Sequence, residues 1–157
     1  MQAATKYPAV IDALRRAPLI IIPMVQEAPP AILKRRPSTA RWSIHEHMCH
    51  LAHVHQLFMS RLEIMLHEPR PTIVPHFPDE QDADDLLLKM DLDEAIRRYD
   101  TDRTMLVARL ETLGDIDWER AAEHREYQRY SVFIMFRHLA LHDFLHGYRI
   151  EQILLER

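Results

Sequence analysis

Histidines are the residues of this sequence with the clearest capacity for chemistry. The segment "RHLALHDFLHGYRIEQIL" places His138, His142 and His146 at intervals of four residues. In an α-helix each interval turns the side chain by only about 40°, so all three lie on one stripe. The stripe is flanked by apolar residues, and burying several imidazoles together is costly unless each finds a partner. Two histidines at this spacing can direct nitrogen lone pairs at one divalent metal ion, so a metal site and ordinary core packing are both open at this point.

A second group of histidines lies about ninety residues earlier, in the segment "WSIHEHMCHLAHVHQ". Projected as a helix, this segment directs His47 and His50 toward its apolar face, whereas His53 borders that face. We expect His45 and His55 to face water. A metal held by two histidines of the last helix needs a third protein ligand from another helix. Geometry alone leaves His47 and His50 as equal candidates.

Glu46 stands one turn before His50 on the same side of this helix. Its carboxylate could accept a hydrogen bond from the His50 imidazole and so orient it. Alternatively, Ser43 followed three residues later by Glu46 is a capping box, in which the glutamate returns to the backbone at the start of the helix. Both roles are open at this point.

The distribution of glycine and proline predicts an all-α fold. The chain contains two glycines, and all ten prolines lie at or before Pro78. A sheet-rich fold needs frequent turn glycines, whereas the proline-free second half can form long helices. Apolar periodicity predicts four helices, which together form a four-helix bundle with long connections. Their approximate ranges are 7–25, bent or divided at Pro18 and Pro23; 43–66; 91–113, closed by Gly114; and 131–156, capped by Ser131.

Length and composition exclude several classes of protein. At 157 residues the chain is predicted to be a single domain, 1–157. A net charge of −4 argues against a nucleic-acid partner, and no apolar run is long enough to span a membrane. The single cysteine, Cys49, excludes an internal disulfide and favours a reducing, cytoplasmic location. We interpret Cys49 as a small buried apolar residue, because it points about 100° away from His50.

These motifs together resemble the DinB/YfiT-like superfamily. The features that carry the resemblance are a Trp-Ser entry to the second helix at Trp42 and Ser43, Glu46 four residues before the His50–Leu51 pair, and an HxxxH motif at His142 and His146. The resemblance covers most of the chain and implies an up-down-down-up four-helix bundle. Carried over residue by residue, the metal triad of the family falls on His50, His142 and His146.

The resemblance also implies a class of chemistry. Members hold nickel, zinc or iron with water in the open positions, act on small molecules, and commonly form homodimers. Some are thiol-dependent S-transferases that use a low-molecular-weight thiol, and others are described only as metal-dependent hydrolases. We favour the transferase, because no general base stands at a fixed spacing from the histidines. The chain departs from the family in carrying Arg149 where glutamine is common, and in its additional histidines His47 and His138.

Arg149 and His138 are the candidate substrate-binding residues. Arg149 could hold a carboxylate of the thiol or of the substrate, or form a surface ion pair at the helix end. His138 could carry a proton on the substrate side, although packing or solvent exposure is the simpler interpretation. Trp118, Tyr127 and Tyr130 are available to line an organic substrate pocket. The sequence identifies no catalytic acid or base.

Three functional hypotheses follow from the residues. The first is a metal-dependent enzyme that acts on small molecules, most simply a thiol-dependent transferase. The second is a non-enzymatic bundle that binds a ligand or a protein partner and is stabilised by metal. The third is a pH-responsive helical protein whose histidines titrate without metal.

Overall fold

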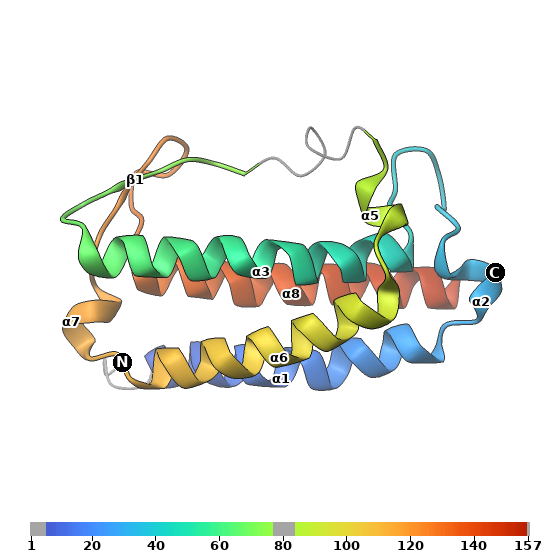
Figure 1. Ribbon diagram of the computed structural model, residues 1–157, viewed down its shortest axis with the longest axis horizontal. Helices are drawn as coiled ribbons and strands as arrows, with labels where there is room; N and C mark the ends of the chain where they lie inside the picture. Colours follow the sequence, from blue (N-terminus) through green and yellow to red (C-terminus); the bar gives the residue numbers. More distant parts are fainter. Residues whose placement is uncertain (1–5, 77–83, 157) are drawn as a thin grey trace.

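The structure is a computed structural model that describes residues 6–76 and 84–156. Four long helices lie lengthwise beside one another (Figure 1). They are α1 (Lys6–Glu27), α3 (Ile44–His67), α6 (Leu92–Glu111) and α8 (Val132–Leu155). Helices α1 and α8 run in one direction, whereas α3 and α6 run in the other (Figure 1). This is the up-down-down-up bundle that the sequence predicted.

The connection between α3 and α6 has to return along the whole bundle, because the two helices run in the same direction (Figure 1). It contains β1 (Thr72–Ile73) and α5 (Leu86–Lys89). Helix α2 (Pro30–Leu33) follows α1, and α7 (Asp115–Trp118) and β2 (Glu123–His124) precede α8. Strands β1 and β2 pair in parallel, with Ile73 opposite His124. The pairing holds two long connections together over one end of the α3–α8 face.

Helix α1 continues through Pro18 and Pro23, so the expectation that these prolines divide it is wrong, whereas a bend at them stays a prediction. Each proline removes a backbone donor, but the apolar face of α1 stays packed in the core on both sides of Pro18, which holds the helix together. Gly114 is the N-cap of α7 and does not close α6. Helix α6 ends at Thr112 in right-handed helical geometry, so its end needs no glycine.

The interior of the bundle contains a buried ion pair. Arg103 of α6 donates to the Asp143 carboxylate of α8 at 2.6 Å and to the Leu14 carbonyl of α1 at 3.0 Å. The Arg103 and Asp143 side chains are 2% and 1% exposed. Each charge is offset by the other in a region from which water is excluded, so loss of either leaves an uncompensated buried charge.

The prediction that His45 and His55 face water is wrong, because both are buried. The His55 imidazole points at α6, where Arg103 Nε lies 3.5 Å from its Nε2. His45 lies beneath the returning connection, next to backbone groups of Leu87 and Met90. A helical wheel shows which side of α3 is apolar, but it does not show that a third element covers the opposite side. Among the described residues, no helix is long and apolar enough to cross a membrane.

Candidate metal centre

Three histidine nitrogens converge between α3 and α8. His142 Nε2 lies 3.0 Å from His50 Nε2 and 3.1 Å from His146 Nε2. The ligand nitrogens of the three histidines all lie within 4.8 Å of one another. His142 and His146 occupy successive turns of one helix, and His50 faces them from the antiparallel neighbour. These are the three residues that the sequence singled out through its family resemblance.

The spacing of His142 from His50 and from His146 fits a shared metal ion. Two nitrogens bound about 2.1 Å from one metal at ordinary coordination angles are about 3.0–3.4 Å apart. Hydrogen bonding alone does not satisfy the cluster, because His142 Nε2 meets two nitrogens and can donate at most one proton. Its Nδ1 is buried without a partner among the described residues. One cation that accepts all three lone pairs resolves the conflict at Nε2 and leaves the proton of His142 on Nδ1.

The environment keeps these imidazoles neutral, which is the form that binds metal. Burial, and then the neighbouring His142, lowers the pKa of His50 to about 2. Burial, and then the neighbouring His138, lowers the pKa of His142 to about 4. The pKa of His146 is also lowered, first by burial and next by His142. At neutral pH no proton therefore has to be displaced from a cationic imidazole before metal binds.

His47, which the sequence left open, contacts the outer nitrogen of one member of the triad. Its Nδ1 lies 2.8 Å from His146 Nδ1, and its side chain is buried. If His146 binds metal through Nε2, its Nδ1 carries the proton and donates to His47. Burial, and then the charge of Arg149, lowers the pKa of His47 to about 4, which keeps it a neutral acceptor. His53, the other open case, is exposed.

Trp42 packs beside the histidine cluster. Its ring centroid lies 4.9 Å from that of His50 and 6.0 Å from that of His146, the latter nearly parallel. The indole therefore shields one side of the triad. Cys49 is fully buried, and burial raises the pKa of its thiol to about 12. The prediction that Cys49 is a core residue is confirmed.

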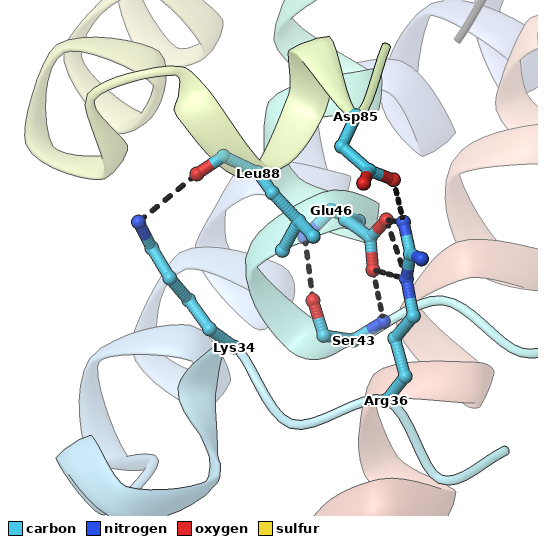
Figure 2. A network of polar contacts seen from close by, with 6 residues as sticks. All are labelled: Lys34, Arg36, Ser43, Glu46, Asp85 and Leu88. Carbon is cyan, nitrogen blue, oxygen red and sulfur yellow. Dashed lines mark hydrogen bonds and ion pairs between the residues drawn. The ribbon is translucent and has the colours of Figure 1, made fainter. Parts of the chain in front are cut away.

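The Glu46 carboxylate forms hydrogen bonds and an ion pair at the start of α3 (Figure 2). The Ser43 N–H donates to its carboxylate at 2.8 Å, and the Ser43 hydroxyl accepts from the Glu46 N–H. Arg36 binds the same carboxylate through Nε at 3.0 Å and also bridges to Asp85 at 2.7 Å. Burial alone would raise the pKa of Glu46, but Arg36 and Ser43 bring it below its ordinary value. The capping-box alternative is thus confirmed, whereas a role in orienting His50 stays a prediction.

A cavity of about 570 Å³ opens beside the triad and extends along α3 and α8. Arg149 and His138, the predicted substrate-binding residues, both line it. Tyr127 and Tyr130 also line it, whereas Trp118 does not and instead stacks on Tyr7 in the core. Sequence reasoning missed other polar groups on its wall, which come from α3 and from the connections before α3, after α3 and before α8. They are Arg41, Arg61, His76, His124 and Glu126.

Comparisons with known proteins agree with this fold. The probable metal-dependent hydrolase YfiT from Bacillus subtilis, described as having an unusual four-helix bundle topology, superposes with a TM-score of 0.86. The match covers 98% of this chain and 87% of that chain at 18% sequence identity, so it shows likeness of fold. No curated protein sequence matches the chain. The sequence profile of the DinB superfamily matches residues 13–150, and the chain therefore belongs to the DinB superfamily.

Proposed function

We propose that the protein is a metal-dependent enzyme that acts on small organic molecules, with a divalent transition metal held by His50, His142 and His146. The observation that carries the proposal is the convergence of three neutral imidazole nitrogens on the wall of a 570 Å³ cavity. Three protein ligands leave coordination positions open, as catalytic sites require. Nickel, zinc and iron all accept imidazole ligands.

A bound metal would supply Lewis acidity and lower the pKa of a thiol or a water molecule in an open position. The chain supplies the rest. Trp42 shields one side of the triad, His47 holds His146, and the cavity admits an organic molecule beside it. The cavity argues against a metal with a purely structural role, which would need no adjoining space. The lowered histidine pKa values argue against a protein that senses pH near 6.5.

We favour transfer of an organic group to a low-molecular-weight thiol. Among the described residues that line the cavity, Glu126 is the one carboxylate, and it is exposed. Among the described residues, no carboxylate base is therefore held next to the triad. A thiol whose pKa is lowered by the bound metal would need no such base. Hydrolysis is the second candidate, because His76 and His138 line the cavity and could accept a proton from water. Homodimer formation stays a prediction.

Elemental analysis of tag-free protein tests the metal site. We expect close to one nickel, zinc or iron per chain, lost in His50→Ala, His142→Ala and His146→Ala. His53→Ala is the matched control, because His53 is exposed on the same helix and lies outside the cavity wall. Wild-type protein that takes up none of the three metals would exclude the proposal. So would retention of metal in all three ligand variants.

Activity assays on the metal-loaded protein separate the two reactions. A panel of low-molecular-weight thiols with 1-chloro-2,4-dinitrobenzene reports transfer, and 4-nitrophenyl acetate without thiol reports hydrolysis. We expect thiol consumption that requires the metal and disappears in His142→Ala. Metal-dependent ester hydrolysis without any thiol turnover would replace the transferase by the hydrolase.

A further inference from the structure

Arg61 is a buried cation without a carboxylate partner among the described residues. It lies on α3 and is only 9% exposed. Nη2 donates to the Val74 carbonyl at 2.5 Å, and the guanidinium lies 5.8 Å from the centre of the Phe58 ring. A guanidinium has five N–H donors and a full charge, so the Val74 carbonyl and the Tyr130 hydroxyl, both neutral, leave most of its capacity unused. Burying such a charge without a counter-ion is costly.

The other buried arginine provides the contrast. Arg103 is more deeply buried, at 2% exposed, and it pairs with the Asp143 carboxylate in the core. No ion pair joins Arg61 to any described acidic residue. Arg61 differs also in its location, because it lines the cavity and Arg103 does not. The space in front of Arg61 is therefore where its counter-ion can enter.

The described histidine and tyrosine side chains around Arg61 do not provide a negative charge, and Glu126, the one described carboxylate on the cavity wall, is exposed and forms no ion pair with Arg61. His76, His124 and His138 line the same part of the cavity. Burial first, and then nearby cations that include Arg61, lower the pKa of each of them, so all three are neutral at neutral pH. Burial raises the pKa of Tyr130, which stays protonated although Arg61 opposes that shift. Arg61 thus faces neutral groups that can hydrogen-bond to an anion but cannot neutralise the guanidinium.

The α3 side of the cavity wall between Arg61 and the triad is apolar. His50 and Arg61 are eleven residues apart, or about 16 Å along the helix. Val54, Leu57 and Phe58 line the interval from α3. Tyr127 and Tyr130 face it from the segment before α8, with their rings nearly parallel at 6.2 Å. An organic body fits this stretch, with a polar head at each end.

We propose that Arg61 is the carboxylate-binding residue of the cavity, and that the ligand is an organic acid with an apolar or aromatic body and its carboxylate remote from the histidine triad. This rests on the proposed function only in taking the cavity as the ligand site. Arg61 then selects the substrate class, whereas the triad governs the reaction. The Val74 contact fixes the guanidinium in place before the ligand arrives, which reduces the entropy lost on binding.

NMR titration of metal-free protein at pH 7 tests the proposal. Phenylacetate is compared with its neutral analogue phenylacetamide, in wild-type protein and in Arg61→Met, Arg61→Lys and Arg97→Met; Arg97 is exposed on α6 and lies outside the cavity wall. We expect wild-type protein to bind phenylacetate about tenfold or more tightly than phenylacetamide, as for a hydrogen bond to a charged group. Arg61→Met should abolish the preference, Arg61→Lys should retain part of it, and Arg97→Met should leave it unchanged.

Absence of a preference in wild-type protein would overturn the proposal, as would its survival in Arg61→Met or its loss in Arg97→Met. Arg61→Met also loses the Val74 contact, so a second measurement uses wild-type protein alone. The Arg61 Nε–Hε resonance should shift with phenylacetate and not with phenylacetamide. A resonance that stays in place while phenylacetate binds would refute the assignment. Because the titration omits metal, it remains decisive if the metal site itself is disproved.

Discussion

Replacement of His47 by alanine should weaken metal binding without removing a ligand. His47 Nδ1 lies 2.8 Å from His146 Nδ1, on the side of the His146 ring opposite to the nitrogen that faces the triad. Partners of this kind fix the tautomer and orientation of a ligating imidazole, and their loss typically costs 10–100-fold in metal affinity. That range equals about 1.4–2.7 kcal/mol at 25 °C. The full effect is expected, because His47 is 3% exposed and water cannot easily replace it.

Competition between the protein and a chromophoric zinc chelator at pH 7.5 measures this loss. His47→Ala should raise the zinc dissociation constant 10–100-fold, whereas His146→Ala should abolish tight binding. His47→Gln should recover part of the affinity, because its amide oxygen can accept from His146. His53→Ala is the control for loss of a histidine from α3. Urea unfolding of the metal-free variants shows whether a general loss of stability contributes.

Two results would refute this reasoning. Zinc affinity of His47→Ala within twofold of wild type would show that the contact does not support His146. Complete loss of zinc in His47→Ala, with His50→Ala unaffected, would show that His47 is the ligand and His50 is not.

Three further predictions concern the scaffold. Arg103→Met should lower the free energy of unfolding by about 3–5 kcal/mol in urea denaturation, because it leaves the Asp143 carboxylate buried and unpaired; a loss below 1 kcal/mol would contradict a dry ion pair. Ser43→Ala removes the cap of α3 and should cost about 1 kcal/mol in the same assay, with no change expected from an exposed serine such as Ser60. Burial, and then Arg103, lowers the pKa of His55 to about 3. Between pH 6.5 and 3, His55 therefore binds a proton in the unfolded chain but not in the folded protein. The free energy of unfolding should therefore keep this contribution above pH 6.5 and fall by up to about 1.4 kcal/mol per pH unit as the pH drops toward 3. His55→Phe should reduce this dependence of the unfolding free energy on pH. An unchanged dependence would show that His55 is accessible to protons.

Local patterns were sufficient for the helices and for the last-helix pair of histidines. The capping box at Ser43 and Glu46 depends on residues three apart, so it can be recognised without any tertiary contact. The same holds for His142 and His146, which share a stripe by helical periodicity alone. The four-helix bundle was predicted because four amphipathic helices bury their apolar stripes by packing against one another.

Helical periodicity alone could not identify which histidine of α3 faces His142 and His146. His47 and His50 both lie on the buried side of α3, and their roles differ by the rotation and offset of α3 against α8. Packing across the interface places His50 against the Nε2 atoms and His47 against the far side of His146. The family resemblance identified His50, because it carries information about that packing which one helix does not contain.

Burial and charge compensation were decided by the tertiary structure. On a helical wheel His45 and His55 are predicted to face solvent. In the structure the returning connection covers His45 and α6 covers His55. Arg61 looks like any surface arginine in the sequence, and only the structure shows that it is buried beside the cavity with no carboxylate partner in residues 6–76 and 84–156. The sequence by itself determined which faces are apolar and which residues share a turn. Which polar group meets which, and which charge is left without a partner, depended on how the helices and their long connections pack together, because those contacts join residues far apart in the chain.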